Sequence, residues 1–204
     1  MGILFTGKPR EFQLGGKQSV TILLVAIFWL CCNTAISQHL LNDNDVKCIE
    51  QSALKYLGHE EYPRGSNKSP YIKIMLRHVG VRIPAPWCAG FVALVLRDVC
   101  HVDYPHSGTV AEWSRGKWEK NIVFDKRKGE KLRPEQIHKG QIFTIYFANL
   151  KRDAHIGIIL GYENGHVITI EGNTNAGGSR EGYGVFIRHR SLNSVSKILV
   201  YENR

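Results

Sequence analysis

The chain has 204 residues, of which 43% are apolar and 22% charged, and this balance excludes an intrinsically disordered protein. Its formal net charge of +9 favours contact with a polyanion, such as nucleic acid, anionic lipid or the acidic polymers of a bacterial envelope. The basic residues are spread along the chain, however, and their one tight cluster is Lys126-Arg127-Lys128. We therefore expect a solvated loop there and no nucleic-acid partner.

Residues 1–37 combine a basic leader, an apolar run at 20–32 and a short uncharged tail. This order, with small residues just before the site, predicts a signal peptide cleaved after Ser37. A retained membrane anchor is the alternative, because the uncharged window is just long enough to span a bilayer. In both cases we expect residues 38–204 to form one exported domain. It would be periplasmic or extracellular, and would be held at the inner membrane only through an uncleaved leader.

Beyond the leader, the spacing of apolar residues changes once along the chain. A period of about 3.6 residues predicts helices at 45–57, 70–78 and 88–99, with a short one at 109–115. From Gly116 onward, a period of two predicts strands at 121–124, 141–147, 154–162, 166–172, 184–189 and 197–202. Helices followed by an antiparallel sheet of about five to six strands indicate an α+β fold with the N-terminal helices packed on the sheet.

Cys88 follows Pro86 and Trp87 and opens an apolar run that continues to Val99. Proline suits the position just before a helix, so Cys88 is expected in the first helical turn. Unpaired N–H groups and the helix dipole stabilise a thiolate at that position and make the sulfur a better nucleophile. We interpret Cys88 as a catalytic nucleophile. The alternative is a small buried hydrophobic residue, which a free cysteine usually is.

The segment Tyr162–His166 separates two strand-like runs, and their apolar residues decide the pairing register. A three-residue loop, Glu163-Asn164-Gly165, places one apolar set on a single face: Ile156, Ile158, Leu160, Ile168 and Ile170. A two-residue turn at Asn164-Gly165 would mix buried and polar types on both faces. We therefore predict the three-residue loop.

That register brings three polar side chains together on the other face of the hairpin. His155 then lies opposite Asn173 and diagonal to Glu171. A cysteine nucleophile needs a base to take its proton and a third group to hold the imidazole in the right tautomer. Gly157 on the same face is expected to leave room for an approaching helix. The alternative is an ordinary polar sheet face turned to solvent.

Three segments, in this order, carry a family resemblance: Pro86-Trp87-Cys88-Ala89-Gly90-Phe91-Val92, His155-Ile156-Gly157-Ile158-Ile159 and Ile170-Glu171-Gly172-Asn173-Thr174-Asn175. They resemble the CHAP family of cysteine- and histidine-dependent amidohydrolases and peptidases, over about residues 67–190. The resemblance implies a papain-like core within a single catalytic domain at 38–204.

The resemblance also implies roles for four residues. Cys88 would be the nucleophile and His155 the general base and then acid, while Glu171 and Asn173 would orient or stabilise the histidine. The implied substrate and partner is bacterial peptidoglycan, cleaved at an amide in the stem peptide or between sugar and peptide. Two other functions stay open: a related amidase or acyltransferase on a non-peptidoglycan substrate, and an inactive envelope-binding module.

Aromatic side chains and possible metal ligands are further candidates for binding roles. Trp87, Tyr146 and Tyr183 are candidates for lining a substrate groove, although aromatic residues more often belong to a core. No metal or cofactor is expected, because the segment at 43–47 lacks ligands of a calcium loop and Cys100-His101 has no second pair for zinc.

Three cysteines follow the leader: Cys48, Cys88 and Cys100. Three is an odd number, so one thiol stays free even if Cys48 and Cys100 form a disulfide. A free thiol in an exported protein is consistent with a catalytic Cys88.

Overall fold

The computed structural model describes residues 41–98, 102–177 and 181–201, which fall within one compact unit spanning residues 39–204. The predicted leader and cleavage site lie outside the described residues, as does Cys100, while Cys48 is an exposed free thiol. Within the described ranges, none of the helices combines the length and apolar character needed to cross a membrane.

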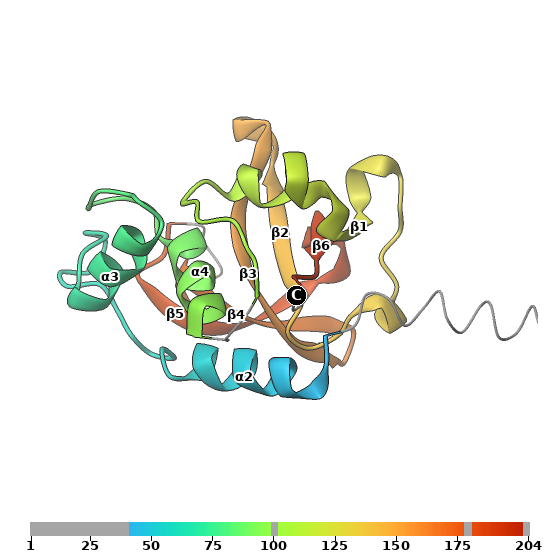
Figure 1. The fold of residues 1–204 in the computed structure, drawn as a ribbon, viewed down its shortest axis with the longest axis horizontal. Coiled ribbons are helices and arrows are strands. Elements are labelled where there is room, and N and C mark those ends of the chain that lie inside the picture. The colour runs from blue at the N-terminus through green and yellow to red at the C-terminus, as the bar shows by residue number, and fades with distance from the viewer. Residues whose placement is uncertain (1–40, 99–101, 178–180, 202–204) are drawn as a thin grey trace, which may run out of the picture. The chain divides into compact units, whose positions relative to one another are not determined.

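Three α-helices form in the first half of the described chain: α2 (Asp43–Leu54), α3 (Pro70–His78) and α4 (Cys88–Asp98) (Figure 1). Side-chain N-caps stabilise the first turns of α2 and α3. The Asn42 side chain accepts the N–H of Asp45 at 3.0 Å, and the Ser69 hydroxyl accepts the N–H of Ile72 at 3.2 Å. The predicted starts of α3 and α4 are confirmed. The helix α2 begins two residues before the predicted start because Asn42 caps it.

The second half forms one antiparallel sheet of six strands, in the order β1-β6-β2-β3-β4-β5. The strands are β1 (Ile122–Asp125), β2 (Ile142–Phe147), β3 (Arg152–Glu163), β4 (His166–Thr174), β5 (Gly184–Ser191) and β6 (Lys197–Leu199). The chain is therefore α+β, as predicted. A 3-10 turn forms at the predicted short helix (Val110–Ser114), and another at the basic cluster (Lys126–Lys128), whose side chains are exposed.

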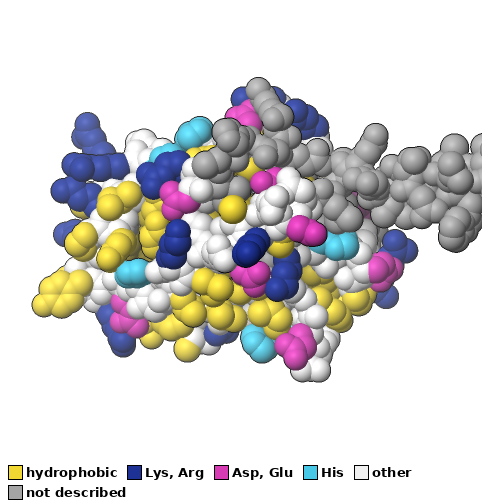
Figure 2. Space-filling view, turned by 60° about the horizontal axis from the view of Figure 1, so that its bottom comes forward, with side chains coloured by type: hydrophobic (Ala, Val, Ile, Leu, Met, Phe, Trp, Pro, Cys, Tyr) yellow, Lys and Arg dark blue, Asp and Glu magenta, His cyan; other side chains and the backbone are white. Residues whose placement is uncertain are grey.

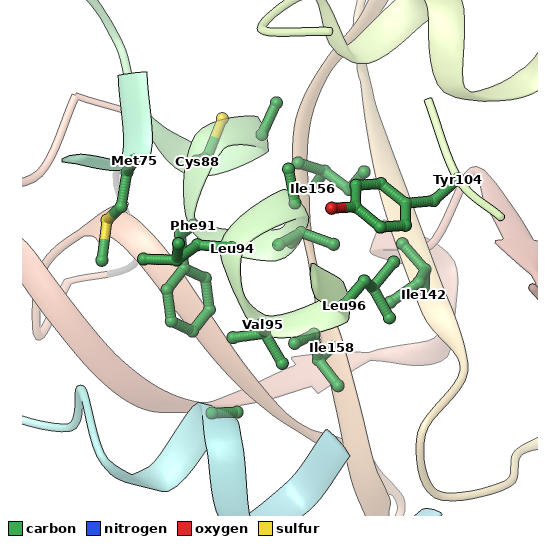
Figure 3. Close-up of a cluster of buried hydrophobic side chains, with 14 of the residues drawn as sticks. Met75, Cys88, Phe91, Leu94, Val95, Leu96, Tyr104, Ile142, Ile156 and Ile158 are labelled. Atoms are coloured by element: carbon green, nitrogen blue, oxygen red, sulfur yellow. The ribbon is translucent and has the colours of Figure 1, made fainter. Parts of the chain in front are cut away.

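The helix α4 packs against β3 and β4, and every residue from Cys88 to Leu96 is buried. Figure 3 shows the helix side chains meeting those of the sheet, and Ile156, Ile158 and Ile170 belong to this core. A glycine in β4 permits the close approach: a Cβ added at Gly172 would lie 2.7 Å from the Cβ of Phe91. The first turn of α4 therefore packs directly on β4.

The opposite face of the sheet is covered as well. Ile159 follows Ile158 and therefore points to the other face, where it packs with Phe143, Val167 and Ile198 in a second hydrophobic cluster. On the surface drawn in Figure 2, basic, acidic and hydrophobic side chains are interspersed over most of the area. The central strands β3 and β4 are therefore buried on both faces over most of their length, and polar side chains there are held in a low-dielectric environment.

The β3–β4 hairpin contains both registers that the sequence allows. Near the site, Ile158 pairs with Ile170 and Ile159 with Thr169, which is the predicted register. A bulge between Ile159 and Gly161 then shifts the pairing by one residue, so the connection is a two-residue turn at 164–165 with positive φ angles of 49° and 81°. The prediction of a three-residue loop is wrong, because the extra residue sits in the bulge and not in the turn.

Candidate active site

Cys88 is the first residue of α4 and is 4% exposed. Its backbone N–H lies in the first helical turn, where N–H groups have no intrahelical acceptor. Burial alone fits a structural cysteine equally well. The distinguishing feature is the neighbour: Cys88 is one of the groups that raise the pKa of the His155 imidazole.

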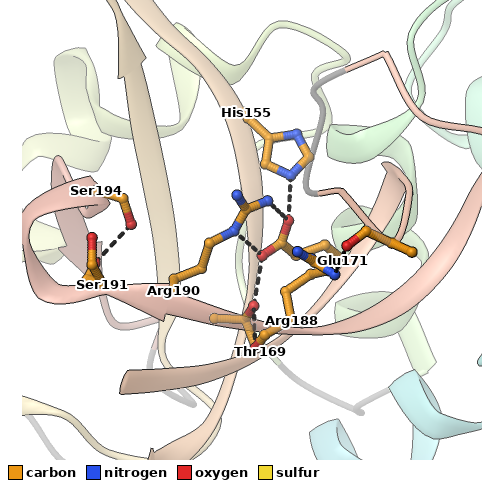
Figure 4. A network of polar contacts seen from close by, with 8 residues as sticks. His155, Thr169, Glu171, Arg188, Arg190, Ser191 and Ser194 are labelled. Atoms are coloured by element: carbon orange, nitrogen blue, oxygen red, sulfur yellow. Dashed lines mark hydrogen bonds and ion pairs between the residues drawn. The ribbon is translucent and has the colours of Figure 1, made fainter. Parts of the chain in front are cut away.

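His155 lies on β3 and is 1% exposed. Its Nε2 atom is 2.7 Å from Oε2 of Glu171, and the other ring nitrogen points away from that carboxylate (Figure 4). This second nitrogen, Nδ1, is buried and makes no hydrogen bond of normal geometry with the described residues. Since Glu171 holds Nε2, Nδ1 is the nitrogen left to exchange a proton with Cys88.

Glu171 is fully buried and both of its oxygens are engaged. The Thr169 hydroxyl donates to Oε1 at 2.6 Å, and the Arg190 guanidinium donates through Nε to Oε1 at 2.8 Å and through Nη2 to Oε2. The carboxylate is therefore fixed in a bidentate clamp, with Oε2 presented to His155.

The sequence analysis identified neither Thr169 nor Arg190. Arg188 and Arg190 alternate along β5, and Thr169 pairs with Arg188, so both arginines face the same side of the sheet as Glu171. The alternation of basic residues along β5 could have indicated an arginine partner for Glu171. That prediction would also have required the β4–β5 register, which the sequence does not determine.

The electrostatic balance favours charged forms of the buried pair. Burial lowers the pKa of His155, but its interactions with Cys88 and Glu171 outweigh burial and raise that pKa to about 9. Burial raises the pKa of Glu171, but the hydrogen bonds and positive charges of Arg190 and His155 bring it down to about 2. At neutral pH the site therefore holds an imidazolium beside a carboxylate.

Asn173 is fully buried at a bulge where the β4–β5 pairing shifts between Glu171 and Thr174. Its φ angle of 56° lies in the left-handed region, and its carbonyl oxygen accepts the N–H of Gly182 at 3.1 Å. The hydrogen bond to the His155 ring comes from Glu171. A direct role for Asn173 stays a prediction.

Burial excludes a solvent-facing location for this polar cluster, since His155, Glu171 and Asn173 are each at most 1% exposed. Gly157 has a different role from the predicted one. A Cβ added there would lie 2.7 Å from Cγ of Glu171 and 2.7 Å from Cε1 of Phe143. The glycine therefore makes room for the carboxylate that holds His155, and not for a helix.

Trp87 does not line a groove, which corrects the prediction. Its side chain is 1% exposed, and its indole N–H donates to Oε1 of Glu61 at 2.9 Å. The second oxygen of this buried glutamate accepts the N–H of Asn67 at 2.9 Å. Through Glu61, the loop before α3 is therefore bound to Trp87, which immediately precedes Cys88. No local sequence pattern indicates this contact, because the two segments are distant in the sequence.

Tyr146 and Tyr183 contact arginines in separate parts of the fold. The exposed ring of Tyr146 lies 5.0 Å from the guanidinium of Arg127, and the half-buried ring of Tyr183 lies 4.4 Å from that of Arg64. Their part in binding a substrate stays a prediction.

The described side chains thus include an imidazole held by a clamped carboxylate and a buried thiol that raises the pKa of that imidazole. A nucleophilic cysteine uses groups of these kinds. No three His, Cys, Asp or Glu side chains gather as a metal site within the described ranges. Comparisons of the chain with family models, curated proteins and solved structures find no significant match.

Proposed function

We propose that this chain is an exported cysteine amidase that hydrolyses amide bonds of bacterial peptidoglycan. The observation that carries the proposal is the buried ring of His155: Glu171 holds its Nε2 atom at 2.7 Å, and both Glu171 and Cys88 raise its pKa. The substrate class and the export rest on the sequence: the resemblance of the three segments to the CHAP family, and the leader at 1–37.

The fold is consistent with a papain-like core, which forms part of the proposal. Cys88 begins a buried helix, and that helix, α4, packs on the two strands that carry His155 and Glu171. This packing holds nucleophile and base on rigid elements.

Before acylation the Cys88 thiol has passed its proton to His155, whose raised pKa keeps the ring an imidazolium at neutral pH. The sulfur attacks the amide carbonyl carbon, and the resulting oxyanion accepts the backbone N–H of Cys88 at the helix start. The C–N bond then breaks as His155 gives its proton to the leaving amine. Because the pKa of His155 is raised to about 9, the imidazole retains that proton at neutral pH until the amine takes it.

Deacylation repeats the proton transfer with water. His155 takes a proton from water as its oxygen attacks the thioester carbonyl, the C–S bond breaks, and the proton returns to the sulfur. Glu171 holds the ring in place throughout and stabilises its charged form.

Digestion of purified peptidoglycan by the full-length chain tests the proposal. We expect new amino groups and matching fragment masses, and a loss of about 10⁴-fold or more in Cys88→Ala. The matched control is Cys48→Ala, which removes an exposed thiol and should leave turnover unchanged. Equal turnover by Cys88→Ala and the unsubstituted chain would overturn the proposal.

A further inference from the structure

A cavity of about 250 Å³ opens where β3 begins, between the 3-10 turns at Val110–Ser114 and Lys126–Lys128. Both Arg152 and Asp153 line it, and His155 follows on the same strand. At about 3.3 Å per strand residue, His155 lies about 7 Å from the cavity wall, roughly two residues of an extended peptide. We take this spacing as the length that a substrate bound beside His155 would span to reach the cavity.

The lining of this cavity carries excess positive charge. Its charged side chains are six basic ones (Arg115, Arg127, Lys128, Lys151, Arg152 and Lys197) and three acidic ones (Glu119, Asp125 and Asp153). The acidic groups are engaged locally. Asp153 pairs with Lys197 at 2.6 Å, Asp125 accepts the N–H of Arg127 at 2.9 Å, and Glu119 accepts the N–H of Gly116 at 3.3 Å.

Four of the basic side chains form no ion pair with the part of the chain that the structure describes: Arg115, Lys128, Lys151 and Arg152. They come from three separate segments, so the positive charge gathers only on folding. Like charges held together repel one another, and a bound anion would remove this cost. Free guanidinium groups also match the two oxygens of a carboxylate.

One wall of the cavity is preformed and polar. The Lys197 ammonium, 9% exposed, donates to Oδ2 of Asp153 and, at 3.2 Å, to the hydroxyl of Ser114. The remaining oxygen, Oδ1, is buried and accepts no hydrogen bond from any described residue. Buried carboxylate oxygens normally have a donor, so a ligand at this wall is expected to carry an N–H or O–H group as well as an anion.

We propose that this cavity is a subsite for a carboxylate group of the substrate's peptide, one or two residues from the scissile amide. The assignment rests on the proposed function, because a peptide stem supplies both the carboxylate and the neighbouring N–H group. The cavity volume suits one residue and not a polymer chain. A phosphate would use the same basic side chains, so the test separates the two sources.

Calorimetric binding to the full-length chain carrying Cys88→Ala tests the subsite without cleavage. The probes are a stem tripeptide with free carboxyl groups, the same tripeptide with those groups amidated, and inorganic phosphate. We expect amidation to weaken binding about tenfold, the size of one or two lost charge-assisted hydrogen bonds. Adding Arg115→Gln and Arg152→Gln should weaken binding of the free acid to a similar extent and leave the amidated peptide unchanged.

Lys73→Gln, which removes an exposed charge from α3, is the matched control and should change neither affinity. Equal binding of the two peptides, or no binding of either, would overturn the subsite. Phosphate binding tighter than the free acid would overturn the carboxylate assignment.

Peptidoglycan turnover by the chain without Cys88→Ala is measured in parallel. If the chain digests peptidoglycan but binds the free and amidated tripeptides equally, the subsite is contradicted and the proposed function is not. Discrimination without turnover supports the subsite and contradicts the proposed function.

Discussion

The guanidinium of Arg190 clamps the carboxylate of Glu171 side-on, with Nε 2.8 Å from Oε1 and Nη2 donating to Oε2. The pair is almost fully buried, with Arg190 13% exposed and Glu171 inaccessible. A buried carboxylate without such a partner would protonate and lose its hold on the histidine. Arg190 is therefore a positioning residue for His155, acting through Glu171.

Replacing Arg190 tests this role. Arg190→Lys keeps the charge but loses the bidentate geometry, so we expect kcat to fall about tenfold. Arg190→Gln should lower it further and move the acid limb of the pH–rate profile to higher pH, because Arg190 holds the pKa of Glu171 down. The control is Arg97→Lys, at an exposed ion pair on α4. An unchanged acid limb in Arg190→Gln would show that the arginine serves stability alone.

Glu171→Gln removes the charge that orients His155 while keeping the side-chain shape. We expect kcat to fall by about 10²- to 10⁴-fold, as when the carboxylate of a Ser-His-Asp triad becomes an amide. The free energy of unfolding should fall by about 3 kcal/mol or more, because the largely buried Arg190 loses the carboxylate that it clamps. Steady-state kinetics and urea denaturation measure the two effects. Activity within twofold of the unsubstituted chain would remove Glu171 from the mechanism.

The shifted pKa values also predict how stability varies with pH. For His155, raised from 6.5 to about 9, the stabilisation is complete below pH 6.5 and is lost as the pH rises through 9. For Glu171, lowered from 4.5 to about 2, it is complete above pH 4.5 and is lost as the pH falls toward 2. Urea midpoints measured across this range should decline from pH 6.5 to 9, and His155→Gln should remove that decline. A parallel decline in the variant would assign the effect to other groups.

Gly157→Ala places a methyl group where the Glu171 side chain and Phe143 now lie, 2.7 Å from each. We expect a loss of about 1–3 kcal/mol in the free energy of unfolding, together with a loss of activity because the carboxylate is displaced. Gly165→Ala is the control. It strains the β3–β4 turn at φ 81° and should lower stability without lowering kcat. Equal kcat for the two variants would contradict the assigned role of Gly157.

The sequence predicted those features that local chemistry dictates. The cap at Ser69 and the proline at 70 set the start of α3, and alternation located all six strands. The apolar set including Ile158 and Ile170 determined the register beside the site correctly, because burial penalises a one-residue slip.

Contacts between distant segments could not be read in the same way. The β5 strand reaches Glu171 after a connection of several residues, whose length does not determine the register that brings Arg190 into place. Trp87 precedes α4, so helical periodicity says nothing about its direction, and Glu61 meets it from a separate loop. The alternation of apolar residues likewise does not predict the bulge before Gly161, because a two-residue and a three-residue loop are both plausible connections between the strands.

The reactivity of the two described thiols tests the central claim most directly. Iodoacetamide is added to the full-length chain at pH 7, and peptide mass spectrometry follows the modification of Cys88 and Cys48 in the same sample. Although Cys88 is buried and Cys48 exposed, we predict that Cys88 reacts about tenfold faster or more, and that His155→Gln removes this advantage. Faster modification of Cys48, or an unchanged ratio in His155→Gln, would contradict a nucleophile activated by His155.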